Sequence, residues 1–133
     1  AITASNHLRV NATCMDDHYF VQWLDLLYFI SYISPMYEVT QTKEFERWHR
    51  ELRDSRAVAR VTTAIERLQF GLIGDFKAVG QGVSEIRIPY GPGYRLYYTM
   101  KERKLVVLLC GGDKSNQKSD IKKAQKLKEE YDV

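Results

Sequence analysis

The chain has 133 residues, enough for one domain around a single hydrophobic core. Hydrophobic residues make up 44% of it and charged residues 28%, which is typical of a globular domain and not of a disordered or low-complexity chain. The net charge of +3 is unevenly placed, because residues 1–35 carry a formal −2 and residues 36–133 a formal +5. A modestly basic domain suits a nucleic-acid or acidic protein partner but does not identify one.

The cysteines and histidines argue against two further classes of protein. Cys14 and Cys110 are too few for a disulfide framework, and Cys110 ends an apolar run, which predicts a small buried side chain and not a reactive thiol. The histidines, His7, His18 and His49, show no metal-ligand spacing. We therefore expect neither a structural metal nor a cofactor.

Residues 1–35 precede a part of the chain that reads as a separate domain beginning at Met36. They include an apolar stretch, residues 19–33, which contains Asp25 and is shorter than the roughly 20 residues that span a bilayer. No basic segment followed by a small-residue cleavage site marks a secretory signal. We expect an N-terminal extension of doubtful origin, either an upstream start-site assignment or an extra helix docked on the domain, and a cytoplasmic protein with no membrane partner.

Residues 36–133 predict an α+β domain. In chain order we expect a strand at 37–40, a helix from Thr42 as N-cap to about Leu52, a helix at about 56–70, strands near 76–79, 85–88, 94–100 and 105–110, and a last helix capped by Ser115 or Ser119. The continuous apolar run of the last strand predicts cover on both faces. This order predicts a small antiparallel-rich twisted sheet backed by two N-terminal helices plus a C-terminal helix.

Apolar stripes at helical spacing mark the core side of each predicted helix and not ligand sites. They comprise Phe45, Trp48 and Leu52 in the first helix, Val58, Val61, Ile65 and Leu68 in the second, and Ile121, Ala124, Leu127 and Tyr131 in the last.

The two strands around the Gly-Pro-Gly turn at residues 91–93 alternate strictly, so each presents two distinct faces. Ile86, Ile88, Leu96, Tyr98 and Met100 are expected on an apolar face, and Glu85, Arg87, Arg95, Tyr97 and Thr99 on a polar one. A polar face on a small antiparallel sheet is most often only solvated. Alternation alone therefore leaves a plain surface and a cationic binding site both open.

Three stretches narrow the choice: GDFKAVGQGVSEIRI at residues 74–88, GPGYRLYY at 91–98 and LLCGGDKSNQKSDIKKA at 108–124. Together with an aromatic-bearing first helix around Phe45 and Trp48, they resemble the RelE/ParE superfamily of bacterial toxins. The HigB-like addiction module killer proteins of type II toxin–antitoxin systems are the nearest branch. The resemblance covers residues 36–133 and implies a RelE-like toxin domain.

The resemblance implies a ribosome-dependent messenger RNA endoribonuclease that is neutralised by a helix-turn-helix, HigA-like antitoxin. Its partners would be the ribosome, the messenger RNA and that antitoxin. Such cleavage needs no metal, because the RNA 2′-hydroxyl attacks the adjacent phosphorus and leaves a 2′,3′-cyclic phosphate. The protein must help to deprotonate that hydroxyl, stabilise the added charge on phosphorus and protonate the leaving 5′-oxygen.

Arg87 and Arg95 are the candidates for a phosphate clamp, because a guanidinium binds two phosphate oxygens and stays charged. The alternative for either arginine is a salt bridge with Glu85. Lys77 could bind the same phosphate or serve as the base, or it could be a solvated edge lysine.

Two further candidates lie near the polar face. Lys114 follows Gly111 and Gly112, which would let the backbone approach a ligand closely, and it could protonate the leaving oxygen or hold a flanking phosphate. Tyr97 could stack on a base or act as general acid, whereas Tyr94 and Tyr98 are expected in the core.

The last predicted helix carries a row of lysines, Lys118, Lys122, Lys123, Lys126 and Lys128. Such a row is usually a solvated face, and the first four are candidates for a sequence-independent RNA contact. The chain lacks the C-terminal aromatic or histidine that several relatives use as acid or base, since Tyr131 is expected on the apolar stripe. The alternatives are a ParE-like inhibitor of DNA gyrase, which would not need the cluster of Arg87, Arg95 and Lys77, and a non-catalytic antitoxin-binding module.

Residues 1–35 should be dispensable for toxicity and for antitoxin binding, because the domain implied by the resemblance begins at Met36. A variant that starts at Met36 should unfold cooperatively and arrest growth as the full chain does. Loss of folding in this variant would instead show that the apolar stretch covers part of the core.

Overall fold

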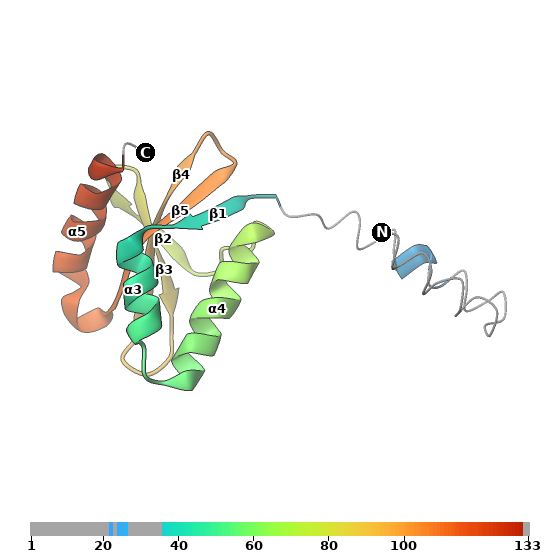
Figure 1. Ribbon diagram of the computed structural model, residues 1–133, viewed down its shortest axis with the longest axis horizontal. Coiled ribbons are helices and arrows are strands. Elements are labelled where there is room, and N and C mark those ends of the chain that lie inside the picture. The colour runs from blue at the N-terminus through green and yellow to red at the C-terminus, as the bar shows by residue number, and fades with distance from the viewer. Residues whose placement is uncertain (1–21, 23, 27–35, 132–133) are drawn as a thin grey trace. The chain divides into compact units, whose positions relative to one another are not determined.

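The structure is a computed structural model that describes residues 22, 24–26 and 36–131 (Figure 1). The chain divides into two compact units, Ala1–Ser34 and Pro35–Val133. In the first unit, residues 22 and 24–26 are helical. The origin of residues 1–35, and the alternative of a helix docked on the domain, fall almost wholly outside the described residues.

The C-terminal unit has the α+β architecture that the sequence predicts. Its elements are β1 (Glu38–Gln41), α3 (Lys43–Glu51), α4 (Ser55–Gln69), β2 (Phe76–Gly80), β3 (Val83–Ile88), β4 (Tyr94–Lys101), β5 (Leu105–Asp113), a short 3-10 helix (Lys114–Asn116) and α5 (Gln117–Glu130). The predicted order of helices and strands is confirmed.

The five strands form one mixed sheet in the order β1-β5-β4-β3-β2. β1 runs parallel to β5 and the other neighbours are antiparallel, so the expectation of an antiparallel-rich sheet is confirmed. Figure 1 shows α4 and α5 on opposite sides of this sheet. The apolar side chains of β5 are buried on both faces, as its continuous apolar run predicts.

Each face of the sheet has its own hydrophobic core. The α3 and α4 face buries Phe45, Val61 and Leu68 against Ile86, Ile88, Leu96, Tyr98, Val106 and Leu108. The α5 face buries Ala124 against Val83, Tyr97, Val107, Leu109 and Cys110. The first group confirms the predicted apolar face of β3 and β4, except that Met100 is 38% exposed.

The helix starts are set by short-range hydrogen bonds. Thr42 is the predicted N-cap of α3: its Oγ1 accepts from the Phe45 amide at 3.1 Å and donates to the Leu109 carbonyl at 2.6 Å. The second bond fastens the start of α3 to β5. Asp54 caps α4 by accepting from the Arg56 amide at 2.9 Å.

The predicted start and end of the last helix need correction. Its N-cap is Asn116, and neither Ser115 nor Ser119 caps it. The Asp113 carboxylate accepts from the Ser115 amide at 2.9 Å and so draws Ser115 into the preceding 3-10 turn. Tyr131 is 47% exposed and lies beyond the stripe, whereas Ile121 and Leu127 pack on the second core as expected.

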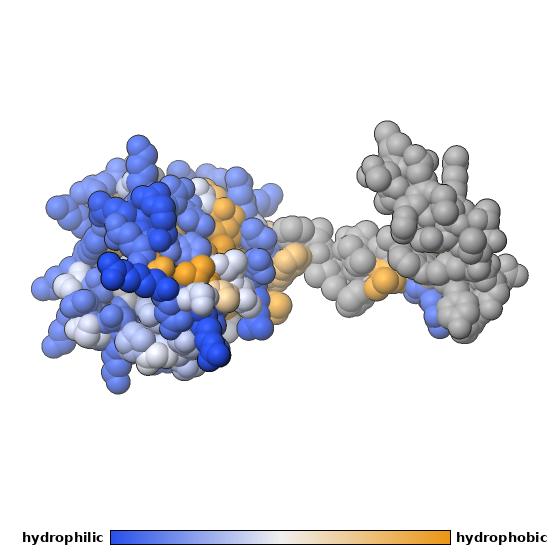
Figure 2. Space-filling view, turned by 60° about the horizontal axis from the view of Figure 1, so that its bottom comes forward, coloured by the Kyte–Doolittle hydropathy of each residue, from blue (hydrophilic) through white to orange (hydrophobic). Residues whose placement is uncertain are grey.

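The face of the C-terminal unit that Figure 2 shows is mostly hydrophilic, with a few hydrophobic areas. The large exposed apolar side chains of this unit are Met36, Leu72, Phe76, Met100 and Tyr131. Across the described ranges, no helix has both the length and the apolar character needed to cross a membrane.

Candidate active site

Strand register brings the predicted site residues together on one face of the sheet. Arg87 on β3 lies directly opposite Arg95 on β4, and Arg95 in turn lies opposite Gly112 on β5. In the neighbouring row of cross-strand partners on the same face, Lys77 on β2 lies opposite Glu85 on β3, and Glu85 lies opposite Tyr97 on β4. Cross-strand partners project to the same side. The prediction that Arg87 and Arg95 share one face of adjacent strands is therefore confirmed.

The inner part of this face is not solvated. α5 packs across it through Ile121, Ala124 and Leu127. Glu85 is 1% exposed, Arg95 9% and Tyr97 0%. The expectation of an open polar face is wrong for these three residues, because the apolar stripe of α5 uses this side of the sheet as its partner.

A buried carboxylate organises the covered residues. Glu85 Oε1 accepts from Arg95 Nη1 at 3.4 Å, and the Gln117 amide nitrogen donates to both Glu85 oxygens, at 3.2 and 3.1 Å. The salt bridge considered as the alternative role for an arginine is therefore present, and Arg95 is the arginine that makes it. Because Gln117 opens α5, this network also fastens the start of that helix to β3.

Tyr97 does not meet the requirements of a general acid or a base-stacking group. Its ring is fully buried, and its hydroxyl has no hydrogen-bond partner among the described residues. Burial, reinforced by the nearby Glu85 carboxylate, raises the pKa of Tyr97 well above its ordinary value. Tyr97 therefore lies in the core and not on an accessible polar face, and this geometry gives its predicted catalytic role no support.

Three predicted cations remain accessible beside the buried network. The Arg87 side chain is 44% exposed, and its Nη2 donates to Asp75 Oδ1 at 2.9 Å. Lys77 is exposed on edge strand β2, and Lys114 is exposed in the 3-10 turn after β5. The base of the Lys114 side chain lies beside the β3–β4 turn, since its Cβ is 3.6 Å from where a Cβ on Gly93 would be.

Gly111 and Gly112 let the helices pack closely on β5. A Cβ on Gly111 would overlap the Trp48 ring of α3, and one on Gly112 would overlap the Asp120 carboxylate of α5. Helix packing therefore accounts for both glycines, although their backbone also borders a second pocket. That they let a ligand approach the backbone stays a prediction.

Some lysines of the row on α5 form ion pairs, and others do not. Lys123 Nζ lies 2.6 Å from Glu44 Oε1 of α3, and Lys126 Nζ lies 4.0 Å from Glu130 Oε1. Lys118 and Lys122 are exposed and make no ion pair with the described residues. Of the four lysines predicted to contact RNA, Lys123 is the one already held by a carboxylate of another element.

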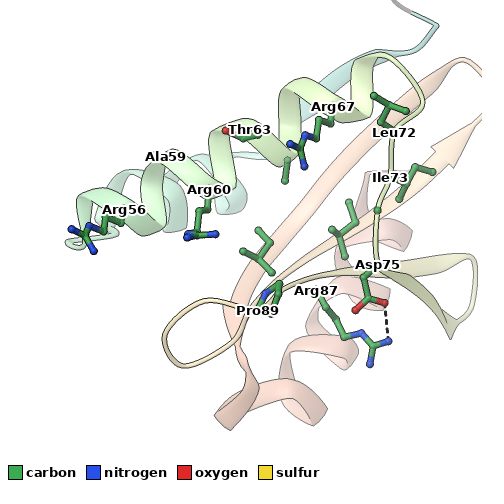
Figure 3. A pocket seen from close by; sticks show the side chains of 14 residues that line it. Arg56, Ala59, Arg60, Thr63, Arg67, Leu72, Ile73, Asp75, Arg87 and Pro89 are labelled. Atoms are coloured by element: carbon green, nitrogen blue, oxygen red, sulfur yellow. Dashed lines mark hydrogen bonds and ion pairs between the residues drawn. The ribbon is translucent and has the colours of Figure 1, made fainter.

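The sequence analysis missed a groove beside the candidate site. It has a volume of about 580 Å³ and lies between α4 and the segment that leads into β2 and along β3 (Figure 3). Four arginines line it, Arg56, Arg60 and Arg67 from α4 and Arg87 from β3, and we call it the arginine groove. The spacing of four and seven residues along α4, next to the apolar stripe, was the available signal.

The chemistry open to the accessible side chains is anion binding. Arg87, Lys77 and Lys114 can bind phosphate oxygens, and the ion pair of Arg87 with the exposed Asp75 is of the weak, solvent-screened kind. Among the described residues, no three His, Cys, Asp or Glu side chains gather in a way that could hold a metal ion.

Comparison with known proteins assigns this chain to one class, the toxins of the RelE/ParE kind. Residues 43–132 match the phage-derived protein Gp49-like family (DUF891), and the chain belongs to this RelE/ParE-like toxin family. An uncharacterized protein of Haemophilus influenzae is 46% identical over 93 residues, which are 70% of this chain and 94% of the relative.

A chain in the crystal structure of the toxin–antitoxin complex RelBE2 from Mycobacterium tuberculosis was also matched. It is 25% identical, with a TM-score of 0.49, over 60% of this chain and 99% of that one.

The Tyr97→Phe variant should keep full toxicity, and its free energy of unfolding should stay within about 1 kcal/mol of the parent or rise. The substitution removes a buried hydroxyl that has no partner among the described residues. Growth arrest on induction and denaturant unfolding would check this. A large loss of toxicity with unchanged stability would show that the Tyr97 hydroxyl takes part in catalysis.

Asp120 should make stability depend on pH in the acid range. Burial raises the pKa of its carboxyl, although Lys123 opposes the shift, and Oδ2 has no partner among the described residues. Because the folded pKa lies above the unfolded one, the unfolded state releases the proton first, and stability falls as the pH rises from about 4 through the raised pKa.

Asp120→Asn should remove this fall and leave the variant more stable than the parent near neutral pH. Denaturant unfolding at a series of pH values from about 3 to 7 would measure it. An identical pH profile in the two proteins would show that Asp120 is solvated in the folded state.

Proposed function

We propose that this chain is the toxin of a type II toxin–antitoxin pair and that it cleaves messenger RNA on the ribosome without a metal. The observation that carries the proposal is the cross-strand pair of Arg87 and Arg95, with Lys77 on the neighbouring strand. Lys114 lies beside the turn that joins the two arginine strands. Membership of a RelE/ParE-like toxin family supports the same reading.

In this proposal Arg87 is the catalytic residue that binds the scissile phosphate. Its guanidinium is partly exposed, and a phosphate could replace or share its weak contact with Asp75. Charge that develops on the phosphate oxygens during the 2′-hydroxyl attack would be stabilised by this arginine and by Lys114.

Arg95 takes a less direct part than the sequence predicts. It is 9% exposed and is paired with Glu85, so we assign it the role of a positioning residue that, through Glu85, holds β3, β4 and the start of α5 together beside Arg87. Proton transfer falls to the exposed lysines, with Lys77 as the proposed base and Lys114 as the proposed acid. A lysine can serve as base only if its surroundings lower its pKa when RNA is bound.

The remaining parts of the proposal concern partners. Lys118, Lys122 and Lys126 would give a second, sequence-independent contact to RNA, whereas Lys123 is tied to Glu44. A toxin of this kind needs a cognate inhibitor, and we propose a helix-turn-helix, HigA-like antitoxin. The place of action would be the cytoplasm, where translated messages are found.

A second candidate is a ParE-like toxin that binds DNA gyrase and cuts nothing, or a module that only binds an antitoxin. The burial of Tyr97 and the neutralisation of Arg95 by Glu85 favour it, because they leave a nuclease with fewer groups for acid–base chemistry. The exposed Arg87, Lys77 and Lys114 favour the nuclease.

Induction of the full chain in bacteria should arrest growth and produce new 5′ ends within translated frames. Arg87→Ala should lower this cleavage at least about tenfold with little change in stability, since a charge-assisted contact in the transition state is worth roughly 1.5–3 kcal/mol. Arg47→Ala, which removes an exposed arginine outside the site, is the matched control. Mapping of 5′ ends beside a gyrase supercoiling assay is the measurement.

Intact transcripts together with inhibited supercoiling would replace the nuclease with the gyrase reading. If the Arg87→Ala variant cleaves messages as well as the parent does, Arg87 does not bind the scissile phosphate. Arg95→Ala is a poorer probe, because it leaves the buried Glu85 without its ion-pair partner and should also lower stability.

A further inference from the structure

The arginine groove combines a cationic rim with an aliphatic floor. Arg56, Arg60 and Arg67 lie along α4 and line the groove, and Arg60 and Arg67 point into the space between this helix and the sheet (Figure 3). Most of the remaining lining is aliphatic, with Ala59 and Ala64 on α4 and Ile73, Ile86, Ile88 and Pro89 across from it, and we call these residues the floor. Leu72, which is 63% exposed, lies at the end of the groove next to Arg67.

The positive charge of the rim is only partly balanced within the described part of the chain, where the Asp54 carboxylate interacts with Arg56. Arg56, Arg60 and Arg67 form no ion pair with any described carboxylate, and the single acidic residue of the lining, Asp75, is paired with Arg87. Arg60 lies 4.7 Å from the centroid of the Tyr90 ring, which holds its guanidinium without neutralising it. The groove therefore complements a negatively charged ligand.

The aliphatic character of the floor decides between two candidate ligands with negative charge, a nucleic acid and an acidic polypeptide. Single-stranded RNA gains much of its affinity by stacking bases on aromatic rings, and no described residue that lines the groove is aromatic. Branched aliphatic side chains and an exposed leucine instead match leucine, isoleucine or valine side chains of a protein. Aliphatic anchors ringed by ion pairs are typical of a protein interface.

We propose that the arginine groove binds an acidic, aliphatic-rich segment of a partner protein. From Arg56 to Arg67 the rim extends roughly 16 Å along the α4 axis, so the segment would need about ten residues if it were helical. Its carboxylates would meet Arg56, Arg60 and Arg67, and its aliphatic side chains would cover Leu72 and Ile73.

The groove adjoins the candidate active site, so a segment bound in the groove would affect the activity of that site. Arg87 lines the groove and is also the proposed phosphate-binding residue. A segment that reaches this end of the groove would compete with RNA for Arg87 and would hold the toxin inactive. This regulatory part rests on the proposed nuclease function, whereas the binding itself does not.

The test uses the full chain and three labelled probes. The first is a peptide of about twelve residues made of Glu, Leu and Ala, with Leu at every third or fourth position to form one face. The second has Gln in place of Glu, and the third is a 2′-O-methyl oligouridine of about the same number of residues, which cannot be cleaved by 2′-hydroxyl attack. Fluorescence anisotropy measures affinity, and amide chemical-shift changes locate the binding site.

The variants are Arg60→Gln with Arg67→Gln, and a control pair, Arg50→Gln with Arg103→Gln, which removes two exposed arginines outside the groove. The groove pair should weaken binding of the acidic peptide at least about fivefold, and the control pair less than about twofold. Shift changes should cluster on α4, at residues 72–75 and at residues 86–89. The Gln peptide should bind more weakly than the Glu peptide.

Equal affinity of the parent and the groove pair for the acidic peptide would overturn the inference, and so would shift changes that cluster elsewhere. Oligouridine affinity that falls in the groove pair, with peptide affinity unchanged, would make the groove an RNA track. Because these measurements involve no cleavage, a chain that binds the peptide but cuts no message would sink the proposed function alone. A nuclease that ignores the peptide would sink this inference alone.

Discussion

The buried carboxylate of Glu85 is the constraint on which the site depends. A charged group that is 1% exposed must be paired and hydrogen-bonded, or its ionisation would cost far more than a small domain can offset. Arg95 from β4 and Gln117 from α5 supply those partners. One carboxylate thereby joins two strands to the start of the last helix.

That network determines which basic side chains of the polar face are buried and which stay exposed. Arg95 is drawn under α5, and Tyr97 next to it is enclosed with it. Arg87 lies opposite Arg95, two residues beyond Glu85 on β3, and it stays partly exposed with Asp75. The same polar strand face thus contributes Arg95 and Tyr97 to a core and Arg87 to an anion-binding surface.

Local patterns in the sequence were sufficient to predict the helices, the strands and the two distinct faces of β3 and β4. They succeeded because period and capping are properties of neighbouring residues, as Thr42 shows by capping α3 as predicted. They could not say what would cover the polar face. The apolar stripe of α5 was evident, but its partner depends on long-range packing, and tyrosine is compatible with both a core and a surface.

The glycine pair and the groove could not be predicted for the same reason. Gly111 and Gly112 are flexible in sequence terms, and only the packing of Trp48 and Asp120 against them shows that they admit helices. The arginines of α4 have the spacing of a solvated helix face, and only the tertiary fold brings that face opposite β3 to form a groove. A sequence shows which residues share an element, and the fold decides what that element faces.

The most direct test of this account is a crystal structure of the full chain with a 2′-O-methyl RNA that spans the site. The account predicts a phosphate bound by the Arg87 guanidinium, with Lys114 and Lys77 beside it. Arg95 should still be paired with Glu85, and α5 should remain in place. A phosphate bound by Arg95 after α5 has left the sheet, or no phosphate near Arg87 at all, would contradict it.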